Sequence, residues 1–305
     1  MQGAYIFVNI ILPIFLQIGA GYVLKKIIDF DLKTLAVVQL YIIIPALMFV
    51  KICEAQMNGN VLFLILVHTL LLFGILCGIG AVVVRIGKMR KSESGAFINS
   101  IAYYNTGNYS IPLVELLYGG GIAMTVQVFI MTIHNVLFNL FGVLIGCSGK
   151  QSIKQSLMEM LKIPMLYSAV IAIILRISHT TVPEPIWHAV DSLGSALVPT
   201  ALISLGAQLA VTRFRLMEWK VLVSAFLRLL ISPAISLGLV YTLGITGELA
   251  QLLVISAATP TATNIALLAI QYNTESEFVA QTIFGSTLFS TVTVTLVILA
   301  AQAIL

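Results

Sequence analysis

The sequence predicts an all-α polytopic membrane protein, with ten transmembrane helices in two inverted five-helix repeats and with helices 4 and 9 broken. Three observations predict this fold class. The chain is strongly apolar, its basic residues gather on one side of the predicted spans, and its prolines recur at a nearly constant offset between the two halves. Together they describe a chain with little mass outside the bilayer.

The composition excludes a water-soluble protein. Of the 305 residues, 59% are hydrophobic and 9% are charged, whereas about 25% of residues in an average soluble domain are charged. The mean hydropathy is +1.06. So few charges cannot cover a soluble fold of this size, which excludes a soluble enzyme, and the small net charge of +4 gives no sign of nucleic-acid binding. A spanning helix needs about 20 apolar residues, so ten spans use about 200.

Charged or turn-rich segments separate the apolar runs into ten predicted spans. They lie near residues 4–24, 34–53, 61–84, 95–118, 122–145, 162–177, 188–210, 219–241, 249–270 and 278–304. The first repeat covers residues 1–145 and the second covers 162–305. A short connecting loop at 146–161 joins them, and no linker of soluble-domain size interrupts the chain.

The basic residues predict the orientation. Thirteen of the sixteen lysines and arginines fall in the first, third, fifth and seventh loops. Loops rich in Lys and Arg stay in the cytoplasm. We therefore expect an integral protein of the plasma (inner) membrane, with a cytoplasmic connecting loop and both termini on the extracytoplasmic side.

The prolines indicate an internal repeat. Each predicted half has a proline in its first, second and fourth spans, which are Pro13, Pro45 and Pro112 and then Pro164, Pro199 and Pro260. The offsets are 151, 154 and 148 residues. Because each half has an odd number of spans, the second half enters the membrane with the opposite orientation, and such inverted repeats bind substrate at their interface. The alternative is a chance alignment of prolines, which are common in membrane helices.

Two of these spans contain poor helix formers near the middle of the membrane. Span 4 has Asn-Thr-Gly-Asn-Tyr-Ser-Ile-Pro at 105–112, and span 9 has Ala-Thr-Pro-Thr-Ala-Thr-Asn at 258–264. Gly is flexible, Asn, Ser and Thr compete for backbone bonds, and Pro lacks a donor. At the helical rise, Asn105 lies about 16 Å from the cytoplasmic end of its span and Pro260 about 18 Å from the outer end of its span, so both are near the middle of a hydrocarbon core about 30 Å thick. Unwound backbone at that depth occurs only where it is buried in protein or lines a polar cavity.

The expected N-terminus of the second half of each broken helix indicates a binding site for an anion. A helix N-terminus offers free N–H groups and the positive end of the helix dipole. We expect Thr259 to cap such a half-helix with Pro260 at its first position, and Asn105 and Asn264 to orient a carboxylate. The predicted substrate-binding residues are Asn105, Thr106, Gly107, Asn108, Pro112, Pro260, Thr261, Thr263 and Asn264. The alternative is a pair of proline kinks that neighbouring Ser and Thr satisfy.

The chain also resembles a known family over nearly its whole length. The similarity is carried by LPIFLQIGAGYVLKK at 12–26, YIIIPALMF at 41–49, NTGNYSIPLVELLYG at 105–119, LVPTALISLGAQLA at 197–210, RLLISPAISL at 228–237 and ATPTATNIALLAIQY at 258–272. These segments resemble the auxin efflux carrier (PIN-like) family, which includes plant auxin carriers and bacterial malate and malonate permeases. The short loop between spans 5 and 6 is similar to that of the small prokaryotic members.

The resemblance implies a fold in which helices 4 and 9 cross at their unwound centres, with substrate beside the crossing. It also implies an elevator-like motion of a transport domain against a scaffold of spans 1, 2, 6 and 7, often in a dimer. By the matched motifs, Asn105, Pro112, Pro260 and Asn264 carry over as crossover residues. Ser110, where many members have Gly, and Asn108, where an apolar residue is usual, depart from the pattern, so the identity of the substrate does not carry over.

Two charged residues within spans invite functional interpretations. Arg228 lies inside span 8, where a charged residue is by default a candidate for function. It is either a fixed positive charge behind the crossover or an arginine that extends to the cytoplasmic surface. Glu115 follows Pro112 by one turn, and it is either a proton acceptor for coupling or a carboxylate near water at a helix end.

Two further features concern helix packing. Gln127 and His134 are seven residues apart in span 5 and so share a face. They either line the transport domain or hydrogen-bond a neighbouring helix. Gly206 and Ala210 form a small-xxx-small pair, which predicts close helix packing. The three cysteines form no CxxC pair, so we expect neither a disulfide framework, a metal site nor a cofactor.

The sequence therefore predicts a secondary transporter, an efflux carrier for a small organic anion such as malate or an auxin-like acid, with an elevator mechanism. An intramembrane enzyme is disfavoured because no HExxH, GxSxG or aspartate-rich metal motif occurs. Two alternatives stay open, a sodium-coupled organic anion symporter of related fold and a membrane ligand sensor without transport. The expected partners are the anion, the lipid bilayer and a second copy bound through the scaffold helices, with no nucleic acid.

Overall fold

The computed structural model describes residues 2–55, 58–146, 164–212, 218–272 and 274–305, and the regular secondary structure of these residues is helical apart from one isolated β-bridge. In the first half the helices are α1 (Gln2–Ile6), η1 (Phe7–Ile11), α2 (Leu12–Ile27), α3 (Leu32–Val38), η2 (Gln39–Ile43), α4 (Ile44–Glu54), α5 (Gly59–Ile86), α6 (Lys91–Ala102), α7 (Ser110–Tyr118), α8 (Gly121–Leu137), η3 (Phe138–Gly142) and α9 (Val143–Gly146). In the second half they are α11 (Pro164–Ile177), α12 (Glu184–Ser195), α13 (Leu197–Val211), α14 (Trp219–Phe226), η4 (Leu227–Ile231), α15 (Ser232–Thr242), α16 (Gly247–Ala257), α17 (Asn264–Gln271) and α18 (Ser276–Ile304).

Seven helical stretches among the described residues are long and apolar enough to cross a membrane. They are Gly3–Ile27, Leu32–Glu54, Gly59–Ile86, Gly121–Gly146, Glu184–Val211, Trp219–Thr242 and Ser276–Ile304. Each coincides with a predicted span, and Pro164–Ile177 and Gly247–Ala257 are shorter apolar helices. Large apolar side chains such as Phe63, Ile174 and Val292 are exposed on these helices, as a surface that faces lipid requires.

Part of the predicted connecting loop cannot be compared with the structure. Of residues 146–161, only Gly146 belongs to the described part of the chain. Five of the thirteen basic residues that predict the orientation also lie outside the described residues. They are Lys150, Lys154, Lys162, Arg213 and Arg215.

In the described part of the chain, three of the four π-helical turns precede a proline. The turns η1, η2 and η4 run directly into helices that carry Pro13, Pro45 and Pro233 at their first or second position. A proline removes one N–H donor and crowds the carbonyl four residues earlier, so the preceding turn widens. These prolines thus widen one turn of each span, and the span continues as a helix.

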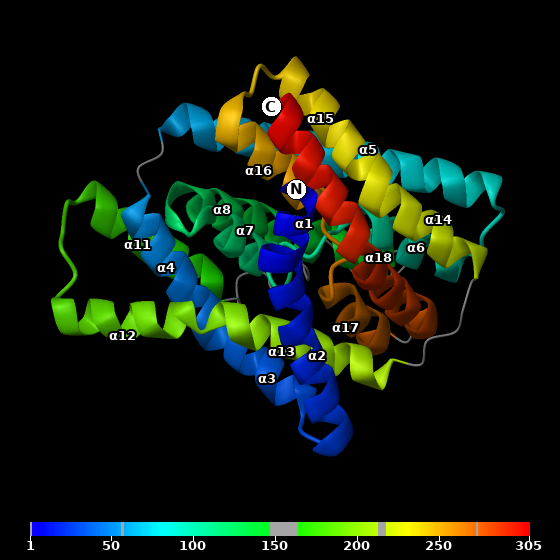
Figure 1. Ribbon diagram of the computed structural model, residues 1–305, viewed down its shortest axis with the longest axis horizontal. Helices are drawn as coiled ribbons and strands as arrows, with labels where there is room; N and C mark the ends of the chain where they lie inside the picture. The colour runs from blue at the N-terminus through cyan, green and yellow to red at the C-terminus, as the bar shows by residue number, and fades with distance from the viewer. Residues whose placement is uncertain (1, 56–57, 147–163, 213–217, 273) are drawn as a thin grey trace.

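The helices pack in two groups (Figure 1). In the smaller group, α2 packs along α13, and α4 packs on α11 and α12. In the larger group, α5 packs on α6, α15 on α16, and α18 on α14 and α16. The smaller group consists of the predicted spans 1, 2, 6 and 7, and the larger group holds the remaining six.

Two glycines allow the closest helix approach. A Cβ atom on Gly206 would lie 1.8 Å from the carbonyl oxygen of Ile18, and one on Gly21 would lie 2.1 Å from that of Ile203. Helices α2 and α13 therefore meet backbone to backbone, which confirms the close packing predicted for Gly206.

A charged cluster joins the ends of α6, α14 and α18. Lys220 and Arg90 each approach Glu93 within 2.8 Å, and Arg90 also lies 3.6 Å from Glu275. Partial burial raises the pKa of Glu93, but hydrogen bonds from Arg90 and Lys220 outweigh this and lower it to about 2. Three loops that the sequence assigns to the same side of the membrane thus lie together.

Candidate functional site

The two predicted breaks exist, and they contact each other. Helix α6 ends at Ala102 and α7 begins at Ser110, while α16 ends at Ala257 and α17 begins at Asn264. Tyr104 and Thr261 form an antiparallel bridge between the two unwound segments. The amide of Asn105 donates to the carbonyl of Pro260 (2.8 Å), and the amide of Ala262 donates to that of Tyr103 (3.0 Å). Each unwound segment therefore satisfies part of the other's backbone hydrogen bonding, as burial in an apolar environment favours.

The first break turns around the side chain of Asn105. Its Oδ1 atom accepts a hydrogen bond from the amide of Asn108 (3.0 Å), and its carbonyl accepts from the amide and hydroxyl of Ser110. This is the local side-chain bonding by which Asn competes with a helix. The Ser110 hydroxyl also lies 2.9 Å from the Thr259 hydroxyl of the second break. Ser110, one of the two residues that depart from the family pattern, thus links the two breaks.

The second break corrects one sequence-based expectation. Thr259 and Pro260 do not begin the second half-helix, because α17 starts at Asn264 after Thr263. The Thr259 hydroxyl donates instead to the carbonyl of Ser256, and Pro260 lies in the extended segment that pairs with the first break. Thr261 is held by its own hydroxyl, which donates to the carbonyl of Ser100 (2.9 Å). Tertiary pairing thus outweighs the local preference of proline for a first helical turn.

Helix α8 supports both breaks from one side. Gln127 is buried, and its Nε2 donates to the carbonyl of Thr106 (2.8 Å) while its Oε1 accepts from the hydroxyl of Ser256 (2.5 Å). His134 is buried on the same helix, with its ring centroid 4.0 Å from that of Tyr104. Gln127 thus bonds directly to the unwound segment of span 4 and to the end of α16, and His134 packs beside them.

Arg228 contacts both breaks from η4. It is completely buried, so the alternative in which it extends to the cytoplasmic surface is wrong. Its guanidinium donates to the carbonyls of Ile101, the next-to-last residue of α6, and Ala257, the last residue of α16.

Several polar groups at the breaks are left without a partner. The Nδ2 atom of Asn105 is buried and bonds to no described residue, although the side chain is only 4% exposed. The amides of Asn264 and Ile265, at the start of α17, also donate to no described residue. Asn108 and Asn264 are partly exposed, and the Nδ2 of Asn108 lies 3.4 Å from the Thr263 hydroxyl. The contact between Asn108 and Thr263 thus brings the first break to the residue that precedes α17.

The expectation of two free half-helix N-termini is wrong for α7. The amides of Ser110 and Ile111 already donate to the carbonyls of Asn105 and Gly107, and Pro112 has no donor. The N-terminus of α17 is thus the one that offers free amides. Glu115 is exposed, on the part of α7 that lies beyond Pro112.

Comparison with known proteins identifies the family of this chain. The chain matches the profile of the family described as "Membrane transport protein" over residues 6–298. It belongs to this family, that of the PIN-like auxin efflux carriers. The chain is therefore an integral membrane transporter and not an enzyme.

Two archaeal relatives agree with this membership. An uncharacterized transporter of Methanothermobacter thermautotrophicus is 27% identical over 306 residues, which cover 94% of this chain and 95% of the relative. An uncharacterized transporter of Methanocaldococcus jannaschii is 27% identical over 273 residues, 87% of this chain and 88% of the relative. Both similarities extend over most of each chain, as expected for transporters of one architecture.

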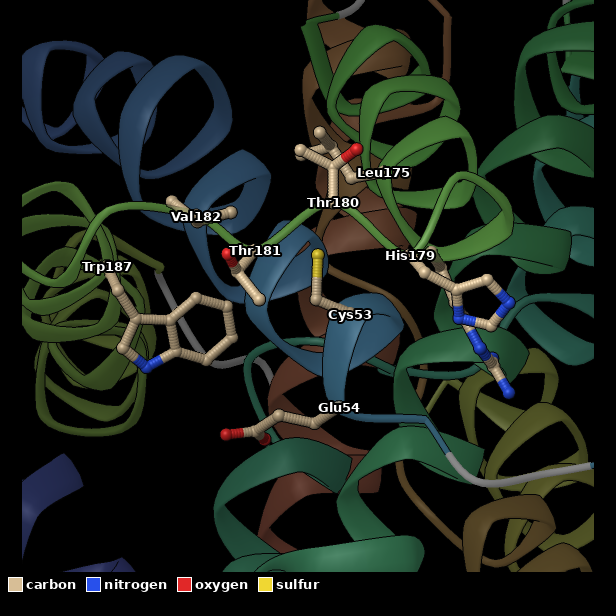
Figure 2. A pocket seen from close by; sticks show the side chains of 9 residues that line it. Cys53, Glu54, Leu175, His179, Thr180, Thr181, Val182 and Trp187 are labelled. Carbon is tan, nitrogen blue, oxygen red and sulfur yellow. The ribbon is translucent and has the colours of Figure 1, made fainter.

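A separate cleft lies between α4, α11 and the start of α12 (Figure 2). It has a volume of about 430 Å³, and its walls include Cys53, Glu54, Arg176, His179 and Trp187. No predicted substrate-binding residue lines it. Among the described residues, no group of three or more His, Cys, Asp or Glu side chains is placed to hold a metal ion.

Sequence reasoning missed the residues that tie the breaks to their neighbours. Tyr104 forms the bridge and lies between Arg228 and His134, and Ser256 and Ser232 are buried partners of Gln127 and Arg228. One signal was present for Ser256. It is the polar residue in the apolar run at 252–257 and precedes Thr259 by three residues, the place where a hydroxyl reaches the broken turn.

Proposed function

We propose that this transporter is a secondary carrier, an efflux carrier for a small organic anion with a carboxylate group, such as malate or an auxin-like acid. The observation that carries the proposal is the buried Nδ2 donor of Asn105, which bonds to no described residue, in a break that Asn108 links to Thr263 at the start of α17. An unpaired buried donor is costly unless something accepts its hydrogen bond. A carboxylate is an acceptor with two oxygens, and the positive end of the α17 dipole favours its charge.

The proposed site uses donors from both breaks. Asn105 contributes its amide from the first break, and Asn264 and Ile265 contribute backbone N–H groups from the second. Asn108 and the Asn264 side chain complete the open side, and Thr106, Gly107, Thr261 and Thr263 shape the backbone around it. Pro112 and Pro260 act by removing donors and holding the breaks. Such a site binds the anion without a cationic side chain in contact with it.

We propose ten membrane spans in two inverted repeats. Seven long helices account for seven spans, and the broken pairs α6–α7 and α16–α17, together with α11, account for the other three. The reciprocal backbone bonds between the breaks favour a repeat of residues 1–145 in residues 162–305. In this arrangement the basic loops face the cytoplasm and both termini face outward, in the plasma (inner) membrane.

The packing of the two helix groups favours an elevator mechanism. The candidate site and its polar supports all belong to the larger group. Apolar side chains meet where the groups touch, with Ile111, Met124 and Met131 of the larger group in one cluster with Met48 and Leu197 of the smaller group. Contacts of this kind are non-directional. The larger group can therefore slide at the cost of weak bonds such as those from Thr132 and Asn135 to the sulfur atoms of Met48 and Met165. The smaller group then forms the scaffold and the contact surface of a homodimer.

Uptake by reconstituted protein tests the proposed site. Proteoliposomes with the wild type, Asn105→Asp and Asn105→Ala are compared for uptake of labelled malate and indole acetate. Asn105→Asp keeps the shape but replaces the Nδ2 donor with an acceptor, and where ionised it repels an anion, so we expect uptake to fall at least tenfold, as a loss of about 1.4 kcal/mol or more would produce. Asn9→Ala, at an exposed asparagine, is the matched control and should transport normally. Equal uptake by Asn105→Asp and the wild type would refute the assignment.

A further inference from the structure

The C-terminal ends of α6 and α16, the helices that precede the two breaks, form a site of negative electrostatic potential. The last carbonyls of a helix have no partner within it and carry the negative end of the helix dipole. Helix α6 ends at Ala102 and α16 ends at Ala257, and the bridge between the breaks begins two residues after Ala102. In transporters with broken helices, such C-terminal ends and unwound carbonyls coordinate the coupling cation.

Arg228 lies at this place. Its Nη1 donates to the Ile101 carbonyl (2.6 Å), and its Nη2 donates to the Ala257 carbonyl (2.5 Å) and to the Ser232 hydroxyl. Its Cζ lies 4.8 Å from the centre of the Tyr104 ring, within the range of a cation–π contact. The planar guanidinium thus joins the ends of both half-helices, which a single-point donor such as Lys does less well.

The side chain of Arg228 extends from a widened helical turn. Arg228 belongs to the π-helical turn η4, which precedes Pro233 in α15. Single π turns of this kind are frequent at functional sites. Arg228 is 0% exposed, and no described carboxylate forms an ion pair with it. Carbonyl dipoles, a hydroxyl and an aromatic face therefore surround the positive charge.

A buried charge without a counter-ion is expensive, so its presence needs a reason. We propose that Arg228 is a tethered cation that fills the cation-binding place between the two half-helix C-termini, so that anion binding requires no sodium or other metal ion. It acts as a positioning residue, because its bonds fix the ends of α6 and α16 and thereby the donors of the candidate site. This inference rests on the proposed function, since it assigns the coupling of the same site.

A cation-response experiment tests the inference without knowledge of the substrate. The apparent melting temperatures of the wild type, Arg228→Ala and Arg228→Met are measured in choline chloride and in sodium or guanidinium chloride at equal, non-denaturing millimolar concentrations. Both variants should melt roughly 5–10 °C lower, because breaking a buried charge network is strongly destabilising. Guanidinium should recover at least half of that fall in Arg228→Ala in a saturable manner, and it should fail in Arg228→Met, whose side chain fills the place.

Two controls separate a filled cation place from general destabilisation. Gln127→Leu removes other bonds at the breaks but leaves Arg228, so it should gain nothing from guanidinium. Arg85→Ala, at an exposed arginine at the end of α5, should behave as the wild type. An Arg228→Ala variant that gains no more than Gln127→Leu overturns the inference, as does an Arg228→Met variant as stable as the wild type.

A wild-type measurement holds whether or not any variant folds. Uptake or ligand binding by the wild type should be unchanged when choline replaces all sodium, potassium and lithium, and a requirement for any of these ions overturns the inference. Failure of the proposed function is a separate result, because it is read from Asn105 variants and not from cation responses.

Discussion

Gln127 offers the sharpest test of how the two breaks are held together. Its side chain is completely buried, and it receives a hydrogen bond from Ser256 while it donates one to the backbone of Thr106. Gln127→Leu keeps a side chain of similar size and removes both bonds. The carbonyl of Thr106 then loses this donor in a buried place, and the hydroxyl of Ser256 loses its acceptor.

The cost follows from these two lost bonds. A buried polar group left unsatisfied costs about 1–3 kcal/mol. The Thr106 carbonyl is fixed in the unwound segment, so its cost lies toward the upper end. The Ser256 hydroxyl can rotate toward a carbonyl of its own helix, so its cost lies toward the lower end. The expected loss of unfolding free energy is about 2–4 kcal/mol, or roughly 5–10 °C in melting temperature for a domain of this size.

Thermal unfolding of purified protein, followed by intrinsic fluorescence, measures this change. The matched control is Gln17→Leu, because Gln17 is only partly buried and its side chain bonds weakly to the Pro13 carbonyl of the same helix. The control should melt within about 1–2 °C of the wild type, as most substitutions away from special contacts do. A Gln127→Leu variant that also melts within this range would refute the view that this side chain supports the breaks.

Three further predictions concern other parts of the chain. Gly206→Ala places a Cβ atom 1.8 Å from the carbonyl oxygen of Ile18, so α2 and α13 must separate and the melting temperature should fall by more than about 5 °C. Gly19→Ala, where a Cβ meets nothing within 4 Å, should not change it. The folded pKa of Glu93 is about 2, against an ordinary value of 4.5, so its ion pairs stabilise the protein above pH 4.5 and are lost as the pH falls toward 2. Wild-type melting temperature should therefore fall in this window more steeply than that of Glu93→Gln, and equal slopes would contradict the assignment. Pro260→Ala restores an amide at the second break, so turnover in proteoliposomes should slow while the dissociation constant of the anion changes little; unchanged turnover would show that this proline does not hold the break.

The architecture was predictable because its signals are strong. Runs of about 20 apolar residues identify spans directly, and seven of the ten were found as long helices. Gly107 and Pro260 marked the two breaks because they disfavour the interior of a helix, and Pro112 marked the first turn of α7, where a missing N–H costs little. The glycine contact at Gly206 was predictable for a similar reason, since small residues at helical spacing allow backbones to meet.

The details of the site depend on pairing between distant segments. Thr259 and Pro260 have the local features of a helix start, yet the bridge between Tyr104 and Thr261 keeps this segment extended and moves the start of α17 to Asn264. Likewise, sequence alone left two positions for Arg228, because nothing local decides whether an arginine extends to the surface or turns inward. The carbonyls that bind it belong to residues more than 25 positions away.

Ligand-induced stabilisation tests the central claim, that the paired breaks form a carboxylate site, most directly. The wild type and Asn105→Ala are melted with increasing malate, malonate, succinate, citrate or indole acetate, because a ligand that binds the native state raises apparent stability by mass action. We predict that at least one carboxylate raises the melting temperature of the wild type in a saturable manner, and that this rise is lost in Asn105→Ala but kept in Asn9→Ala. An equal rise in the wild type and in Asn105→Ala would contradict the claim and place the anion elsewhere.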